Sequence, residues 1–110
     1  GIDPMARISQ EEIFGPVLPV VQFKKEEEVI KMVNDSPYGL SASVFSKDVD
    51  RCYRMSTGIR TGLVWVNCWF ARDLRTPFGG MKSSGVGREG GRYSLEFFSE
   101  AKTISYKYKI

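Results

Sequence analysis

Residues 40–67 (LSASVFSKDVDRCYRMSTGIRTGLVWVN) contain the pattern that decides the fold class. Residues 40–46 alternate apolar with small polar side chains, which predicts a largely buried strand. Residues 62–67 (GLVWVN) have few polar positions, which predicts an interior strand. A helical segment separates these two runs, and a strand–helix–strand unit of this kind predicts an α/β fold with parallel strands.

The helix between the two strands is predicted over residues 48–56. Ser46 or Asp48 is its expected N-cap, because either side-chain oxygen accepts a hydrogen bond from the free N–H groups of a first helical turn. Thr57 and Gly58 close the helix, since glycine is common where helices end.

The chain before this unit predicts a further strand and helix. Residues 16–23 (PVLPVVQF) form a short valine-rich run, and Pro19 places this strand at a sheet edge or marks its beginning. Residues 24–34 (KKEEEVIKMVN) have apolar side chains at helical spacing and acids in the first turn, where the helix dipole favours them. Pro37 limits this helix because proline disfavours the helical conformation in the preceding residue.

The chain after this unit predicts an irregular, glycine-rich stretch over residues 68–88, then a helix over 88–99 and an alternating strand over 103–110 (TISYKYKI). Long loops in compact domains are often functional. Three helices could cover one face of a parallel sheet, but such sheets are covered on both faces. The pattern therefore indicates part of a larger domain.

The composition narrows the possible functions. The 110 residues are 42% hydrophobic and 26% charged, and the net charge of +3 is too small to indicate nucleic-acid binding. No apolar run approaches the roughly 20 residues that cross a bilayer, so no membrane association is expected. The lack of histidine excludes Cys-His and Ser-His-Asp nucleophile systems within the chain and argues against a zinc site. Cys52 and Cys68 form no CxxC pair, which indicates a reduced, cytoplasmic protein.

Four segments together resemble the aldehyde dehydrogenase superfamily. They are residues 11–17 (EEIFGPV), 34–40 (NDSPYGL), 62–68 (GLVWVNC) and 77–89 (PFGGMKSSGVGRE). Each segment is a weak signal alone, but their order and spacing resemble the last quarter of that family. Residues 67–80 (NCWFARDLRTPFGG) resemble the branch that oxidises 2-aminomuconate or 2-hydroxymuconate semialdehyde.

The resemblance implies a whole protein with a Rossmann-like NAD domain, a catalytic α/β domain and a small β oligomerisation arm. This chain would hold the C-terminal part of the catalytic domain over residues 5–101 and an oligomerisation strand over residues 102–110, after a tag remnant at residues 1–4. The family's catalytic cysteine and glutamate base would lie upstream, so we expect no catalytic residue and no activity in this chain alone. The alternative is a short non-catalytic structural or interaction module derived from the family.

The resemblance also implies NAD, with NADP possible, as the cofactor of the complete enzyme, and no cofactor bound tightly by this chain alone. Glu12 would accept hydrogen bonds from the nicotinamide ribose, and Phe14 would pack near the nicotinamide. The chemistry is suitable, because one carboxylate accepts two hydroxyl hydrogen bonds and its charge strengthens each. The alternative is that Glu12 lies in a turn before a strand.

The expected substrate-binding residues follow the strand of residues 62–67. The resemblance places Phe78 in an aromatic wall of the substrate tunnel and a polar contact at Asn67. Trp69 is a similar candidate, although both aromatic residues fit an ordinary core or rim position. Cys68 is expected to be a buried or pocket thiol rather than a nucleophile, because it has no nearby base.

Arg72 is the most informative residue, because aldehyde dehydrogenases commonly have apolar or aromatic residues near its position. A guanidinium in the tunnel wall would bind a substrate's distal carboxylate in bidentate fashion. Arg75 is a second candidate for this role. The alternative is that Arg72 pairs with Asp73 or Glu89 on a loop surface. Glu89 itself would either join a proton path, as the resemblance implies, or be a solvated acid at the start of a helix.

The expected partners are an aldehyde substrate in the complete enzyme and further copies of the chain. Along residues 103–110 one face is apolar, and in the family the corresponding strand adds to a sheet of a neighbouring subunit. We therefore expect a homo-oligomer formed through these residues. The alternative is that the segment frays and its lysines keep the chain monomeric.

Overall fold

A parallel pair of strands lies at the centre of the fold in the computed structural model, which describes residues 1–109. Strand β2 (Ser41–Val44) pairs with β3 (Leu63–Val66), in a register from Ser41 opposite Leu63 to Val44 opposite Val66. The helix α3 (Val49–Gly58) connects them. The predicted strand–helix–strand unit with parallel strands is therefore confirmed.

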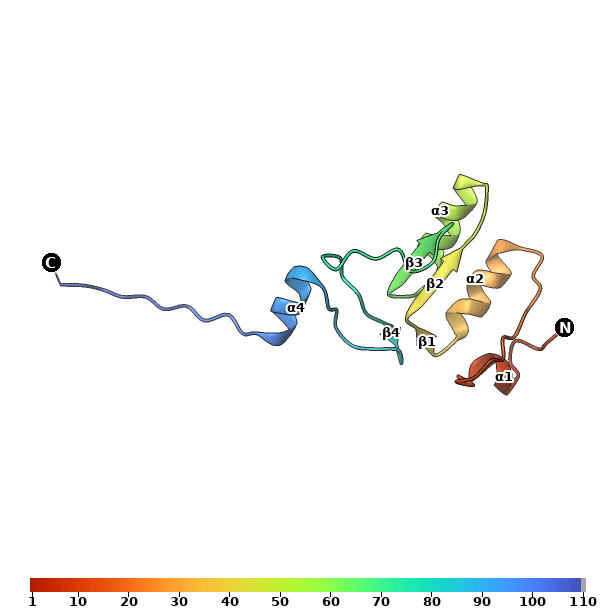
Figure 1. Ribbon diagram of the computed structural model, residues 1–110, viewed down its shortest axis with the longest axis horizontal. Helices are drawn as coiled ribbons and strands as arrows, with labels where there is room; N and C mark the ends of the chain where they lie inside the picture. Colours follow the sequence, from red (N-terminus) through yellow and green to blue (C-terminus); the bar gives the residue numbers. More distant parts are fainter. Residues whose placement is uncertain (110) are drawn as a thin grey trace.

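Helices α2 (Glu26–Asp35) and α3 pack beside this pair and close its small core (Figure 1). The buried side chains of the core cluster are Val44, Cys52, Met55 and Ile59. Partly buried apolar residues of α2, β2 and β3 pack against them: Val29, Ile30, Val33, Ala42 and Val64. The helical spacing predicted for residues 24–34 is confirmed, because its apolar positions contact this core.

The ends of α3 follow from its sequence. Asp48 is the N-cap, and its carboxylate accepts a hydrogen bond from the Arg51 backbone N–H at 3.0 Å. Ser46, the other candidate, instead accepts a hydrogen bond from the Asp48 N–H through its hydroxyl at 3.1 Å. The helix ends at Gly58, in agreement with the predicted closing residues.

An ion cluster joins α2 to α3 on their exposed side. The Glu26 carboxylate accepts hydrogen bonds from Nε of Arg51 and Nε of Arg54, each at 2.8 Å. These guanidinium groups, Arg54 first and then Arg51, lower the pKa of Glu26 from 4.5 to about 2. The helix dipole was expected to favour the glutamates of the first turn. One of them, Glu26, also joins the two helices.

A second, antiparallel pair connects the core to the following loop. Strand β1 (Tyr38–Gly39) pairs with β4 (Met81–Lys82). Neither this pair nor the short helix α1 (Arg7–Gln10) was predicted. Both depend on contacts that local periodicity does not contain, since the two strands are too short to show an alternation.

The predicted strand at residues 16–23 is wrong. These residues adopt no strand or helix, and Leu18 and Val20 are 84% and 70% exposed. Among the described residues, no other strand pairs with this run, and its two prolines have no N–H group to donate to a ladder. High valine content favours a strand only when a neighbouring strand is available.

The C-terminal region departs from the prediction in one respect. Helix α4 (Gly91–Phe98) lies within the predicted helix of residues 88–99 and begins after Gly90, which has a φ of 100°. Residues 103–109 were predicted to form a strand, but in the single chain they are unpaired and exposed, and residue 110 lies outside the described residues. Figure 1 shows this tail running away from the packed elements. The radius of gyration is accordingly 19.8 Å, against roughly 13 Å for a compact chain of 100 residues.

The glycines of the loop are explained by close packing. A Cβ atom on Gly62 would lie 1.6 Å from the Gly79 carbonyl oxygen, so the two backbone segments touch here. Neither Gly79 nor Gly80 has a left-handed φ. A Cβ on Gly80 would lie 2.5 Å from the Ser84 carbonyl oxygen. These positions therefore need glycine because there is no space for a side chain.

Within residues 1–109, no helix is long and apolar enough to cross a membrane. The same part of the chain contains no cluster of three or more potential metal ligands.

Candidate functional site

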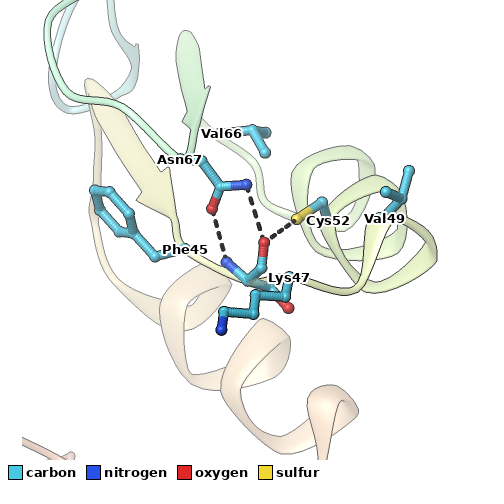
Figure 2. Close-up of a pocket in the computed structure, with 7 residues that line it drawn as sticks. Phe45, Lys47, Val49, Cys52, Val66 and Asn67 are labelled. Carbon is cyan, nitrogen blue, oxygen red and sulfur yellow. Dashed lines mark hydrogen bonds between the residues drawn. The ribbon is translucent and has the colours of Figure 1, made fainter.

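The carboxyl ends of β2 and β3 lie at the same edge of the sheet, where open α/β sheets commonly bind ligands. Asn67 follows β3 directly, with a φ of 54° that asparagine tolerates better than most residues. Its side-chain oxygen accepts a hydrogen bond from the Ser46 N–H, and its side-chain nitrogen donates to the Ser46 carbonyl, each at 2.9 Å (Figure 2). Both halves of the amide therefore hold the ends of the two strands together.

An open hollow of about 560 Å³ lies beside this pair of hydrogen bonds. Its lining residues are Phe45, Ser46, Lys47, Val49, Cys52, Val66 and Asn67. Figure 2 shows the Cys52 thiol directed at the Ser46 carbonyl, at a sulfur–oxygen distance of 3.6 Å. The lining contains one ammonium group and no carboxylate or imidazole, so it provides no acid–base pair.

The loop after β3 brings three of the singled-out residues together. The Arg72 guanidinium lies over the Phe78 ring, with its carbon 4.2 Å from the ring centroid. Its Nη2 atom donates to Oε1 of Glu89 at 2.7 Å. Phe78 and Glu89 also form an isolated antiparallel bridge, with backbone N–O distances of 2.8 Å in both directions. Arg72 thus has an aromatic platform and a carboxylate partner.

Arg75, the second candidate, has a different environment. Its guanidinium binds the Asp73 carboxylate and lowers the pKa of that group. The Arg75 side chain is 87% exposed, whereas the Arg72 side chain is 28% exposed. Asp73 and Glu89 were the two partners considered for Arg72. In the structure Arg72 pairs with Glu89, and Asp73 pairs with Arg75.

Trp69 contributes to an aromatic group at the start of the loop. It is 74% exposed, and its ring centroid lies 5.3 Å from that of Phe70. Phe70 in turn lies 5.9 Å from the buried Trp65, whose indole N–H donates to the Ala71 carbonyl at 2.8 Å. These contacts fix the backbone that leads to Arg72. Cys68 is a half-buried free cysteine.

Glu12 and Phe14 lie on a different part of the molecule. Glu12 is exposed and lines a groove of about 830 Å³ between the N-terminal segment, α2 and β1. Phe14 is 93% exposed and has a φ of 52°. Neither Arg72 nor Phe78 lines this groove. Within this chain Glu12 is therefore not brought together with the residues proposed to bind substrate.

Sequence reasoning missed Lys82, which holds the loop to the core. Its ammonium group donates to the carbonyls of Asn34 and Ser36, each at 2.9 Å. These carbonyls lie at the C-terminal end of α2, where cations are favourable. A lysine within a glycine-rich motif was the available signal, but the partners lie 48 and 46 residues away in the sequence.

The sequence and the structure are both similar to those of known proteins. The sequence pattern of the aldehyde dehydrogenase family matches residues 1–104. The 2-aminomuconic semialdehyde dehydrogenase of Mus musculus is 57% identical over 103 residues, which are 94% of this chain and 21% of that protein. The 2-hydroxymuconic semialdehyde dehydrogenase of Pseudomonas sp. (strain CF600) is 48% identical over 107 residues, which are 97% of this chain and 22% of that protein.

Among solved structures, a mutant of the P. syringae indole-3-acetaldehyde dehydrogenase, in complex with NAD⁺ and IAA, has a TM-score of 0.87 and 42% identity. The match covers 93% of this chain and 21% of that one. The described residues thus form a small mixed α/β unit that matches part of such structures. The chain spans about a fifth of the length of the relatives that it matches.

Proposed function

The chain belongs to the aldehyde dehydrogenase family, and from this premise we propose that it is part of an NAD(P)-dependent enzyme that oxidises a carboxylated semialdehyde. The overall reaction converts the aldehyde, water and the oxidised cofactor into a carboxylate, the reduced cofactor and two protons. The chain contributes a ribose anchor at Glu12, a substrate-tunnel wall that includes Arg72, and a subunit contact at residues 103–110.

The observation that carries the proposal is the environment of Arg72. The guanidinium lies over a phenylalanine ring, and this contact restricts its movement and favours a defined direction for its N–H groups. A carboxylate distal to the aldehyde can then form two parallel charge-assisted hydrogen bonds with it. Phe78 supports the guanidinium, and we propose Trp69 and Asn67 as further substrate contacts in the complete enzyme. The two named relatives, both semialdehyde dehydrogenases, support the same substrate class.

The residues proposed for the cofactor fit a dinucleotide. Among the described residues, the Glu12 carboxylate accepts no hydrogen bond, and it is exposed beside a groove large enough for a sugar. Phe14 presents nearly its whole ring to solvent. NAD, when bound, accepts the hydride of the substrate. Glu12 would bind the ribose hydroxyls and Phe14 would pack near the nicotinamide ring.

The test of this proposal compares two substrate classes in the complete enzyme. For semialdehydes with a distal carboxylate, Arg72→Ala should lower kcat/KM by roughly 10- to 150-fold, which corresponds to about 1.5–3 kcal/mol for a hydrogen bond to a charged group. It should spare simple aldehydes. Arg75→Ala is the matched control, because it removes the same charge from an exposed position. Equal losses for both substrate classes would show that Arg72 acts only through the structure.

A second candidate, a non-catalytic interaction module, is favoured by the exposed apolar tail. Ile104, Tyr106 and Tyr108 are 59%, 74% and 80% exposed, and the two tyrosine rings stack with centroids 6.2 Å apart. An apolar surface of this kind favours a partner chain. A subunit contact in the complete enzyme requires the same surface, so self-association is compatible with both candidates, and activity of the complete protein distinguishes them.

A further inference from the structure

We propose that Glu89 determines substrate specificity as an internal competitor: its carboxylate occupies Arg72 until the carboxylate of the substrate replaces it. This inference rests on the proposed function, in which Arg72 anchors a distal carboxylate. It adds that Glu89 keeps the anchor occupied when an uncharged aldehyde is present. Only the carboxylate of the proper substrate displaces the Glu89 carboxylate from Arg72.

The geometry of the pair suits an exchange. The two side chains share a single hydrogen bond, from Nη2 of Arg72 to Oε1 of Glu89 at 2.7 Å. A guanidinium has five N–H donors, so this bond uses a small part of its capacity. An incoming carboxylate that binds in bidentate fashion forms one more charge-assisted hydrogen bond than Glu89 does.

The backbone holds Glu89 in place while its side chain is free to leave. Its N–H and carbonyl both bond to Phe78 at 2.8 Å, so the residue returns to the same position beside the guanidinium. Its side chain is 58% exposed, against 28% for Arg72. Water can therefore solvate the displaced carboxylate, and Arg72 remains stacked on the Phe78 ring.

The neighbouring pair of Arg75 and Asp73 shows what this arrangement adds. Asp73 lies two residues from Arg75 and receives three hydrogen bonds from its side chain. Among residues 1–109, no aromatic ring lies under the Arg75 guanidinium. That pair is local and solvated, and it offers a ligand no platform. Of these two pairs, the Arg72 pair combines a carboxylate held by one hydrogen bond with a guanidinium that lies over an aromatic ring.

The test measures competition directly in the full 110-residue chain. Muconate, an unsaturated six-carbon dicarboxylate, is titrated while the Nε–Hε signal of Arg72 is followed by NMR. Glu89→Gln should lower the dissociation constant by a factor of about 1.4 to 5, because an exposed ion pair contributes ~0.2–1 kcal/mol. Glu96→Gln is the matched control: it removes the same charge from an exposed pair with Arg92 on α4 and should leave the constant unchanged.

A second variant separates competition from folding. Glu89→Asp keeps the charge but shortens the side chain, so it should also weaken the contact with Arg72 and lower the dissociation constant. Equal constants in wild type and Glu89→Gln would overturn this inference while leaving Arg72 as the anchor. Equal decreases in Glu89→Gln and Glu96→Gln would overturn it too, because the effect would then be one of net charge. No response of Arg72 to muconate in any of these chains would overturn this inference, whereas the proposed function is decided separately by the Arg72→Ala comparison in the complete enzyme.

Discussion

Residues 41–44 and residues 103–109 both alternate apolar and polar side chains, but β2 pairs with β3 along its length while the tail extends unpaired into solvent (Figure 1). Val44 is 8% exposed in the first segment, and Tyr108 is 80% exposed in the second. The patterns predict strands equally well. The difference teaches that an alternating segment becomes a strand only where another strand supplies its hydrogen-bond partners.

The largest effect should come from Gly62, where the packed region leaves no space. In Gly62→Ala the new Cβ meets the Gly79 carbonyl oxygen, so backbone must move and the free energy of unfolding should fall by about 3 kcal/mol. Urea denaturation of the 110-residue chain measures this loss. Gly58→Ala is the control, since its Cβ meets only the flexible Ile30 side chain, at 3.1 Å. Equal losses in the two variants would contradict the close approach.

A somewhat smaller effect is expected from the core beneath the strands. Met55 is 8% exposed, so Met55→Ala should destabilise the chain by about 2–3 kcal/mol through lost burial and a residual cavity. Met81→Ala at a 40% exposed position should cost less than about 1 kcal/mol. Thermal unfolding of both variants gives the comparison. Equal losses of stability in the two variants would contradict the core described here.

The ion cluster on the packed helices should make stability depend on pH. Because the folded state lowers the pKa of Glu26 from 4.5 to about 2, its contribution is complete above pH 4.5 and is lost as the pH falls toward 2. Glu26→Gln should therefore flatten the fall of stability over this interval, measured by denaturation at several pH values. Glu27→Gln is the control on the same helical turn. If the stability of both variants falls with decreasing pH as steeply as that of the wild type, the ion cluster does not couple α2 to α3.

The smallest effect on stability should come from the tail. A chain that ends at Ala101 should keep the free energy of unfolding within about 0.5 kcal/mol, because residues 103–109 are exposed and unpaired. The same truncation should abolish self-association, since it removes the apolar strand edge proposed as a subunit contact. Sedimentation of both chains at high micromolar concentration is the measurement. Two monomers would show that the tail is not an assembly element.

Sequence reasoning succeeded where the decisive information is local. The strands, the helix between them and the cap at Asp48 follow from short-range periodicity and from one side chain that bonds to its own first turn. It failed at residues 16–23, because whether a valine-rich run pairs depends on a partner elsewhere.

The candidate site was predictable in its residues but not in its geometry. A resemblance of motifs singled out Arg72, Phe78 and Glu89. The contact between Arg72 and Glu89 spans 17 residues, and the choice between Glu89 and Asp73 as a partner needed the bridge that places Phe78 beside Glu89. The bond from Lys82 to the end of α2 spans 48 residues and left no periodic signal.

The amide of Asn67 has a mechanical consequence. Its two hydrogen bonds to Ser46 add a rung to the parallel ladder with a side chain instead of a peptide group. The backbone is therefore free to turn at the residue that ends the ladder, and the loop leaves the sheet about a fixed point. The ends of the two strands are therefore joined at the residue where the loop begins, so a change in the length or sequence of the loop need not separate the strands.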